Sequence, residues 1–431
     1  MSLALITLIL LGTMVVLFAI GTEIAVAIGI VSAIGLMFFV NMPLTQFPYT
    51  AFDFQNSFVL TAIPLFVFMG SIFADTGVIR SLFTSADKLI GFLPGGVACS
   101  VLGANAIFGA ICGSSLAATG TFGRIAFPEM ERLGYDPKLS LGVIAIGGTL
   151  SVLIPPSIIL IVYGFWENVS VVKLFAGGII PGVLFTALLI LTVAIQVKLN
   201  PTLVPRSQSY SLREKLIGLR DILPFLVVIG LVLGVIFGGV MTPTEAAALG
   251  AFLAIVFALI YRKMTWFALK DSMLTSVQLV SMIAYVAVLA SVLRIVFQRI
   301  GLTEGFLAFA NTLPLGRYGM WAMVVVLYLI LGCFFESFSM LLLTLPFIGP
   351  LMVQLGFDLV WFGVVYVVLA EIGMVTPPFG LNLFVLNSLV PKYDIMTIAW
   401  GALPYLIPAM VLIALMTVFP QLVLWLPSIM Y

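Results

Sequence analysis

Histidine is absent from the 431-residue sequence, and only 8% of the residues are charged. Without histidine the chain lacks the commonest metal ligand and the usual proton carrier near neutral pH. The net charge of +1 indicates no strongly basic surface for nucleic acid. A Ser–His pair is impossible and no Gly-x-x-x-x-Gly-Lys-Ser/Thr loop occurs, so an enzyme is poorly supported. Cys99, Cys112 and Cys333 lie far apart in apolar surroundings, which predicts buried thiols and no disulfide framework.

Apolar residues make up 63% of the chain. A soluble domain carries about a quarter charged residues, and folded soluble proteins bury at most about three quarters of the surface of the unfolded chain. A soluble fold could not hide this much apolar surface, so lipid must be the solvent. We therefore expect an all-α polytopic membrane protein.

A helix needs about 20 apolar residues to cross a bilayer. Ten stretches qualify: 3–20, 22–41, 57–75, 138–165, 170–197, 222–240, 244–261, 272–297, 358–387 and 398–425. The first has neither a leading basic region nor a small-residue cleavage site, so we expect a retained transmembrane helix rather than a signal peptide.

Two further apolar stretches, 95–127 and 318–350, are long enough for two helices each. Small or polar residues interrupt their centres, at 112–115 and 335–339. A helix that dips into the membrane and returns on the same side fits this pattern. Because irregular backbone at membrane depth is tolerated only within protein or beside water, the two stretches predict re-entrant helical hairpins.

The distribution of Lys and Arg supports this topology. With two hairpins and the N-terminus outside, fourteen of the 18 basic residues fall on the cytoplasmic side. They are Arg80, Lys88, Arg124, Arg132, Lys138, Lys198, Arg206, Arg213, Lys215, Arg220, Arg262, Lys263, Lys270 and Lys392. The four outside are Lys173, Arg294, Arg299 and Arg317. If either hairpin were a single span, every later loop would lie on the opposite side of the membrane. The excess of Lys and Arg on the cytoplasmic side would then be smaller.

The sequence repeats at an offset of 222 residues. Pro155-Pro156 falls on Pro377-Pro378, Ser115 on Ser337, and Asp136 on Asp358. Five crossings and one hairpin in each half predict inverted repeats, which are typical of secondary transporters. We expect a first repeat at 1–199 with hairpin 95–127 and broken helix 138–165, a cytoplasmic connection at 200–221, and a second repeat at 222–431 with hairpin 318–350 and broken helix 358–387. Asp136 and Asp358 are expected to cap helices.

Each Pro-Pro pair lies in the middle of a predicted span. Proline removes a helix N–H and clashes with the carbonyl four residues earlier, so each pair frees carbonyls near mid-membrane. Such carbonyls and a hydroxyl from the facing hairpin would make an oxygen-rich site for sodium. The alternative is a structural kink whose carbonyls are satisfied by neighbouring helices.

The two hairpin turns carry hydroxyl and carboxyl groups. Helix N-termini at such turns favour anionic groups, and small residues there also let helices pack closely. Glu336 and Glu371 lie in apolar runs, where each could ligate sodium, carry a proton, pair with a buried arginine or make a structural hydrogen bond. As candidates for contact with the transported solute we take Ser114, Glu336, Ser339 and Asn382.

The motifs resemble those of a known family. Phe108 to Ser115, Pro128-Glu129-Met130 with Gly134-Tyr135-Asp136, Gly148 to Ser157, Pro243 to Ala246 and Val375 to Gly380 are similar to segments of the large membrane subunit of the tripartite ATP-independent periplasmic (TRAP) transporters. The resemblance covers essentially the whole chain. Two positions depart from the family: Cys112 replaces a serine in the first turn, and Ser151 replaces a glycine in the Gly-Thr-Leu-Gly run.

The resemblance implies an elevator-type, sodium-coupled importer of a small organic acid anion in the bacterial inner membrane, with a periplasmic N-terminus. It implies two separate partners, a soluble periplasmic substrate-binding protein (P type) and a small four-helix membrane subunit (Q type). It implies sodium sites formed by Ser115, Ser151, Ile154, Pro156, Ser337, Gly373, Thr376 and Pro378.

Three other functions are open. The chain could be a stand-alone sodium-coupled anion transporter or antiporter without a binding protein. A channel would need a continuous pore, and the sequence has no ring of charges or filter-like segment. A non-transporting assembly subunit would leave the paired broken helices unexplained.

Overall fold

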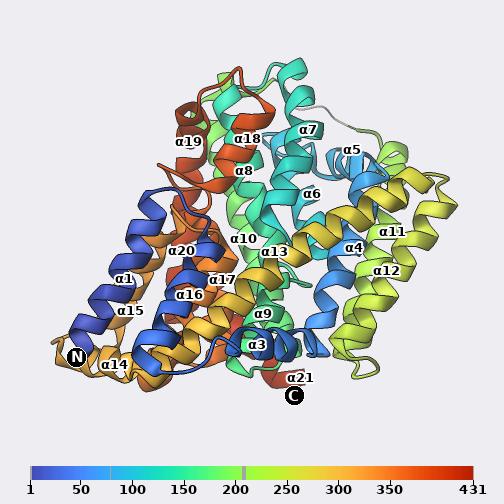
Figure 1. The fold of residues 1–431 in the computed structure, drawn as a ribbon. Helices are drawn as coiled ribbons and strands as arrows, with labels where there is room; N and C mark the ends of the chain where they lie inside the picture. The colour runs from blue at the N-terminus through green and yellow to red at the C-terminus, as the bar shows by residue number, and fades with distance from the viewer. Residues whose placement is uncertain (1, 78, 206–209, 431) are drawn as a thin grey trace.

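The structure is a computed structural model that describes residues 2–77, 79–205 and 210–430, and every regular element in these ranges is a helix (Figure 1). Six described helical stretches are long and apolar enough to cross a bilayer, and two bent pairs raise the number to eight. The six are α10 (Val171–Leu199), α11 (Leu212–Phe237), α12 (Pro243–Ile260), α13 (Trp266–Arg299), α16 (Ser337–Gln354) and the stretch Ile395–Val418. The chain is therefore an all-helical polytopic membrane protein.

Bent pairs and shorter apolar helices account for the other predicted spans. The bent pairs are α3 (Gln46–Gln55) with η2 (Val59–Thr61) and α4 (Ala62–Asp75), at 67°, and α8 (Pro137–Leu153) with α9 (Ile158–Glu167), at 42°. The shorter helices include α1 (Leu3–Ala19), α2 (Ile24–Ile34) with the π-helix η1 (Gly35–Val40), and α17 (Leu359–Gly373), which precedes α18 (Leu381–Leu389). These helices are shorter than the predicted spans because the predictions included apolar residues of the turns and of the second break.

The last predicted span, 398–425, corresponds to the stretch Ile395–Val418, which ends earlier than predicted. The chain forms α19 (Ile395–Ala402), η4 (Leu403–Tyr405), α20 (Leu406–Val418) and α21 (Gln421–Met430). Phe419 leaves the helical conformation, with φ −120° and ψ 74°, directly before Pro420. Proline disfavours the helical conformation of the residue before it, so the sequence contains the signal for this break.

The predicted connection at 200–221 is only partly non-helical. It includes the short helix η3 (Pro201–Leu203), and α11 begins at Leu212, because Ser211 and Glu214 form a reciprocal capping box. Residues 212–221 therefore belong to the helix. Arg206, which we assigned to the cytoplasmic side, lies outside the described residues.

Two helix–turn–helix pairs correspond to the predicted hairpins. The first is α6 (Val97–Cys112) with α7 (Ser115–Leu133), and the second is α15 (Arg317–Gly332) with α16. Figure 1 shows α6 and α7 in the upper half of the molecule and α15 and α16 in the lower half. The two pairs therefore approach the middle from opposite ends.

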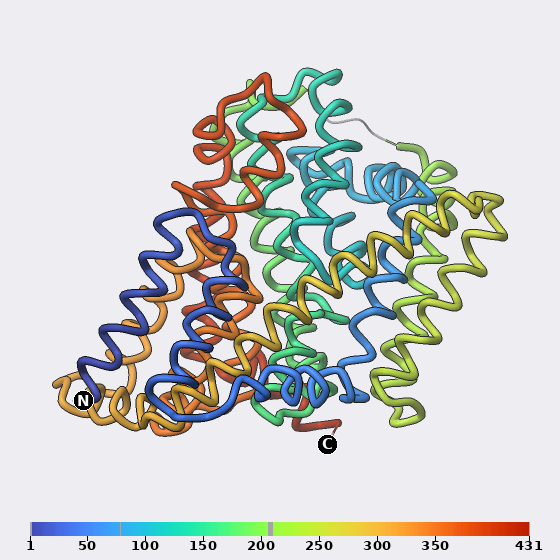
Figure 2. Tube along the Cα trace, in the orientation of Figure 1, coloured from blue at the N-terminus to red at the C-terminus, as the bar shows by residue number. Residues whose placement is uncertain are grey.

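The repeat extends to two helices that the sequence analysis did not predict. These helices, α5 (Ile79–Ile90) and α14 (Leu302–Thr312), lie one repeat offset apart. The repeats also differ in one element, because the bent pair α3–α4 has a single 34-residue helix, α13, as its counterpart. Figure 2 shows α13 as a long diagonal across the molecule.

Helices α8 and α17 form the centre of the molecule, and their side chains are almost all buried. Both begin at the predicted caps: Asp136 accepts a hydrogen bond from the Leu139 amide at 3.0 Å, and Asp358 accepts one from the Val360 amide at 2.7 Å. Helices α6, α7, α18 and α19 pack on α8, and α15 and α16 pack on α17. The helix breaks and hairpin turns thereby converge in the interior.

Candidate functional site

The two hairpin turns meet at one small cavity. Its volume is about 30 Å³, more than the roughly 10–15 Å³ that a cavity needs to hold one water molecule. Residues from both turns and from both broken helices line it, among them Ser114, Ser115, Glu336, Ser337 and Glu371. Residues separated by more than 200 positions in the sequence therefore share one small cavity, where serine and glutamate side chains lie among mostly apolar lining residues.

The first turn is shaped by Gly113 and Ser114. Gly113 has φ +62°, a left-handed conformation that ends α6 and favours glycine. The Ser114 hydroxyl accepts a hydrogen bond from the Ala117 amide at 3.4 Å and caps α7. Cys112, where the family has serine, is buried and packs on Gly70 of α4. The Cys112 thiol therefore contributes to packing, but it cannot supply a hydroxyl oxygen as a ligand for sodium.

The first helix break lies directly against this turn. Ile154 is extended and ends α8, and Ser157 caps α9 by accepting from the Leu160 amide at 3.4 Å. A Cβ on Gly113 would lie 3.3 Å from the Pro156 carbonyl oxygen, so turn and break are in close contact. The Ser151 hydroxyl is fully buried and has no hydrogen-bond partner among the described residues. An unpaired buried hydroxyl is costly, which fits a ligand atom rather than a packing atom.

The second turn and break repeat this arrangement with differences. A Cβ on Gly332 would lie 2.8 Å from the Gly373 Cα, so hairpin and broken helix touch backbone to backbone. The Thr376 hydroxyl donates to the Ile372 carbonyl at 2.7 Å, and Pro378 is exposed, whereas Pro156 is buried. The second break is therefore longer and more open than the first.

Of the eight predicted sodium ligands, Ser115 and Ser337 line the cavity, and the other six lie at or beside the two helix breaks. Ser115, Ser151, Ile154 and Pro156 come from the first turn and break, and Ser337, Gly373, Thr376 and Pro378 come from the second. The unpaired Ser151 hydroxyl and the carbonyl at Pro156 fit a hard cation, which prefers oxygen. The residues of the first set thus fit sodium, and those of the second set are more exposed.

The four predicted solute contacts separate in space. Ser114 and Glu336 line the cavity, and Ser339 donates its hydroxyl to Glu336 at 3.4 Å. Asn382 lies against α8 instead, where its amide nitrogen donates to the Ala145 carbonyl at 3.5 Å. Ser114, Glu336 and Ser339 therefore lie at the hairpin turns, and only Ser114 and Glu336 line the cavity. Asn382 lies away from the turns and does not line the cavity.

Two buried polar side chains beside α8 were missed by the sequence analysis. The Asn105 side-chain carbonyl and the Thr119 hydroxyl have no hydrogen-bond partner among the described residues. They lie against Gly147 and Gly148, where a Cβ would approach them to 2.9 and 1.9 Å. The glycine pair was a usable signal, because consecutive glycines in a helix often mark close approach by another chain segment.

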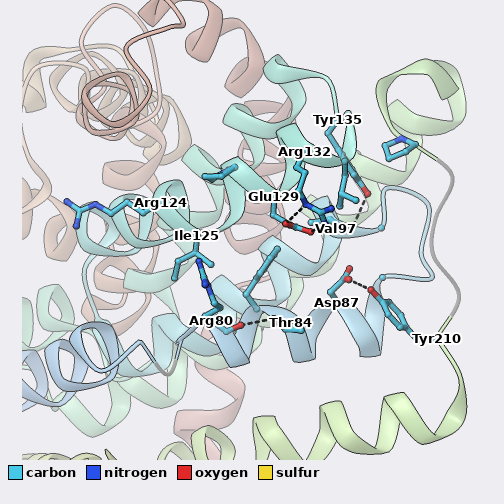
Figure 3. Close-up of a pocket in the computed structure, with 16 residues that line it drawn as sticks. Arg80, Thr84, Asp87, Val97, Arg124, Ile125, Glu129, Arg132, Tyr135 and Tyr210 are labelled. Atoms are coloured by element: carbon cyan, nitrogen blue, oxygen red, sulfur yellow. Dashed lines mark hydrogen bonds and ion pairs between the residues drawn. The ribbon is translucent and has the colours of Figure 1, made fainter. Parts of the chain in front are cut away.

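A second cavity, of about 600 Å³, lies between α5 and α7. Arg80, Arg124 and Arg132 line it, and Figure 3 shows Arg132 beside Glu129 and the Arg124 side chain extending away from the other labelled residues. Arg132 donates to Glu129 from Nε at 3.0 Å and from Nη2 at 2.5 Å, so this arginine is already paired. Arg80 and Arg124 have no hydrogen-bonded carboxylate among the described residues, which leaves this cavity with donors for an anion.

The turn after α7 fixes one wall of this arginine-lined cavity. The Tyr135 hydroxyl accepts from the Val97 amide at 3.0 Å and donates to the Gly95 carbonyl at 3.3 Å. These bonds connect the start of α6 to the end of α7. Burial raises the pKa of Tyr135 to about 12, so the hydroxyl keeps its proton at physiological pH.

Paired helix breaks, and two helix–turn–helix pairs whose serine and glutamate side chains meet at one cavity within a membrane-spanning fold, are typical of a membrane transport protein. Residues 11–422 match the family model described as "Tripartite ATP-independent periplasmic transporter, DctM component". The chain belongs to this family, as a large permease component of a TRAP transporter, and is not an enzyme.

The chain is similar to a C4-dicarboxylate TRAP transporter large permease protein DctM of Vibrio cholerae, at 30% identity over 100% of this chain and 98% of that protein. It is 30% identical to an isethionate TRAP transporter permease protein DctMQ of Oleidesulfovibrio alaskensis, over 95% of this chain and 64% of that protein. The fold is similar to the crystal structure of the Alcanivorax borkumensis YdaH transporter, which has an unusual topology. That match has a TM-score of 0.60, 14% identity and coverage of 88% of this chain and 89% of the other.

Proposed function

We propose that this chain is the large permease subunit of a sodium-coupled secondary transporter that imports a small organic acid anion delivered by a soluble binding protein. The observation that carries the proposal is the meeting of two hairpin turns and two broken helices at one cavity that serine and glutamate side chains help to line. Residues from both repeats face this cavity, so movement of either hairpin would open it toward one side only. Such a site is suited to alternating access.

The proposed orientation puts the N-terminus in the periplasm and the open end of α6–α7 in the cytoplasm. Arg80, Arg132 and Lys392 then lie on the cytoplasmic side, and Arg294 and Arg317 on the outer side, in agreement with the positive-inside rule. In this orientation α6–α7 and α15–α16 are re-entrant hairpins, and the two halves are inverted repeats.

The proposed movement is that of an elevator. The hairpins pack on α8 and α17, so they can move with the broken helices as one body. Helices α2 and α4 each pack on α13, and these three helices would form the static frame. Two backbone contacts, Gly109 with Ser151 and Gly332 with Gly373, connect each hairpin to its own broken helix. Contacts this close favour joint movement of hairpin and broken helix.

Sodium, when bound, would supply positive charge that offsets the charge of the incoming anion and stabilises the closed turns. The chain's part is to present oxygen atoms without a large rearrangement. Ser151 and the Pro156 carbonyl do this in the first repeat, and Ser337 and Thr376 in the second. Taking an anion into the membrane interior without such compensation costs many kcal/mol.

The arginine-lined cavity is proposed as the vestibule through which the anion leaves to the cytoplasm. It lies beside α7, on the cytoplasmic side of the first turn in the proposed orientation. Arg80 and Arg124 would attract a carboxylate or sulfonate by charge. C4-dicarboxylate and isethionate, the substrates in the names of two relatives, are both small organic anions.

Two partners are proposed as separate chains. The name DctMQ of one relative indicates that large and small subunits are joined in that longer protein, which supports a separate small four-helix subunit beside this chain. The family description "tripartite" supports a third component, the soluble binding protein.

The deciding experiment is uptake of a labelled anion into proteoliposomes that contain this chain and its small subunit. Uptake that requires both a sodium gradient and the soluble protein is the expected result. Uptake that requires sodium but not the soluble protein would support a stand-alone transporter. Uptake indifferent to sodium would overturn the assignment of the broken helices as sodium sites.

A further inference from the structure

The cavity between the hairpin turns contains a carboxyl group that the two predicted sodium sets leave unused. Glu371, on α17, is only 2% exposed. Its Oε1 accepts a hydrogen bond from the Ser337 hydroxyl at 3.0 Å, and the Ser115 hydroxyl of the first turn also interacts with the carboxyl group, whereas Oε2 has no partner in hydrogen-bonding geometry among the described residues. An acceptor oxygen left unpaired in the interior costs free energy unless something outside the chain satisfies it.

A second carboxyl group lines the same cavity. Glu336, half-buried at the start of α16, belongs to the second hairpin turn, and its Oε2 accepts from the Ser339 hydroxyl. None of the residues that line the cavity is a lysine or an arginine. Neither glutamate forms an ion pair within the described parts of the chain. Of the alternatives that the sequence left open for these glutamates, pairing with a buried arginine is therefore not what the structure contains.

Two carboxyl groups that face one small cavity repel each other when both are ionised. A cation bound between them removes this repulsion and satisfies the unpaired Oε2. The cavity has room for one small ion without its water shell, and every polar side-chain atom along it is an oxygen. A hard monovalent cation suits this set better than a divalent ion, which takes six or more oxygen ligands.

We propose that Glu336 and Glu371 bind a further sodium ion between them, with the Ser337 hydroxyl oxygen as a third ligand. This inference rests on the proposed function, because it adds an ion to a transporter already taken to be sodium-coupled. The ion would lie between the two predicted sets. It would join the start of α16 in the second hairpin to α17, and so hold the second hairpin against its own broken helix beside the tip of the first.

The structure also gives the direction from which the ion enters. Glu336 is partly exposed and Glu371 is 2% exposed, which favours entry of the ion past Glu336. Glu336→Gln should therefore slow binding as well as weaken it. Glu371→Gln should abolish this one site.

The test measures sodium binding directly, with ²²Na⁺ and the permease complex in lipid nanodiscs at constant ionic strength set by choline chloride. We expect the wild-type complex to bind one more sodium ion per chain than Glu371→Gln. Ser337→Ala should keep the site but weaken it by about 10–100-fold, because it removes one oxygen that orients the carboxyl group. The control is Glu129→Gln, a carboxyl group on α7 of the first hairpin that lies outside this cavity and pairs with exposed Arg132.

An unchanged stoichiometry in Glu371→Gln would overturn the proposal. So would a loss that is equal in Glu129→Gln. If Glu371→Gln does not fold, Glu371→Asp provides the test. This variant keeps the negative charge, so it should bind as many sodium ions per chain as the wild type, but more weakly. Failure of the proposed function is distinguishable, because then the wild-type complex itself would show no sodium-driven uptake, whatever the binding stoichiometry of the variants.

Discussion

At the scale of single residues, glycines and small polar side chains set the geometry of the site. The sequence identified several of them, because Pro-Pro pairs and serine-rich turns are visible without a structure. It could not show that Ser151 is unpaired or that Glu371 and Glu336 share a cavity. Those facts depend on the contact between helices that are far apart in the sequence, and local patterns carry no information about that contact.

Gly332→Ala should destabilise the second hairpin. The added Cβ would lie 2.8 Å from the Gly373 Cα, and backbone cannot move aside as a flexible side chain can. We expect a loss of about 1–3 kcal/mol, typical of overpacking. The measurement is thermal unfolding of the purified complex. Gly230→Ala is the matched control, since nothing lies within 4 Å of its Cβ in α11, and it should be neutral or stabilising.

Ser151→Ala separates a ligand role from a packing role. The hydroxyl has no partner among the described residues, so its removal should leave the unfolding temperature unchanged or raise it. Sodium dependence should nevertheless weaken, because the first set loses an oxygen. The comparison variant is Ser276→Ala, a buried serine whose hydroxyl donates to the Ser272 carbonyl at 2.6 Å. An equal sodium response in both variants would count against a ligand role for Ser151.

At the scale of elements, the sequence located most helices but misjudged where some of them end. The breaks before Pro420 and at Ser211 follow rules of local chemistry that composition windows ignore. Helices α5 and α14 were missed for another reason. α5 has charged residues among its apolar ones and α14 is only 11 residues long, so neither resembles a span. The repeat offset relates the two helices, because α5 and α14 lie at counterpart positions in the two repeats. Recognising either helix would therefore have predicted the other.

The first hairpin depends on one tyrosine at its open end. Tyr135→Phe removes the bonds to Val97 and Gly95 and should cost about 1 kcal/mol of stability. Burial raises the pKa of Tyr135 from its usual 10 to about 12, so the contribution of this residue to stability depends on pH. Below pH about 10 the group is protonated in both states, so its contribution is constant. Between about 10 and 12 the unfolded state loses the proton first, so stability falls as pH rises.

The measurement is the unfolding temperature of wild type and Tyr135→Phe across this pH range. The difference between the two should shrink above pH about 10. Tyr318→Phe serves as control, because Tyr318 is exposed at the start of α15. A constant difference at all pH values would contradict the assigned cause.

At the scale of the whole molecule, the proposed orientation can be tested with single cysteines. The native thiols Cys99, Cys112 and Cys333 are buried and should react slowly. Thr312→Cys, at the end of α14, should react with a membrane-impermeant maleimide in cells whose outer membrane is permeable to it. Glu131→Cys, at the end of α7, should react only after the inner membrane is opened. The reverse pattern would invert the whole topology, including the assignment of the arginine-lined cavity to the cytoplasm.

The distribution of charge over the molecule gives the last prediction. If the cavity beside α7 releases the anion, Arg124 acts at a distance through its field, and Arg124→Gln should reduce exchange of internal anion several-fold at low ionic strength. The reduction should vanish near 1 M choline chloride, where the screening length falls to about 3 Å. Exchange in proteoliposomes at fixed sodium measures this. Arg299→Gln, on the opposite side in the proposed orientation, removes the same charge from outside the cavity and should show no such dependence on salt. If the Arg124→Gln defect persists at high salt, the arginine acts by direct contact or through the structure, and the cavity does not guide the anion by its charge.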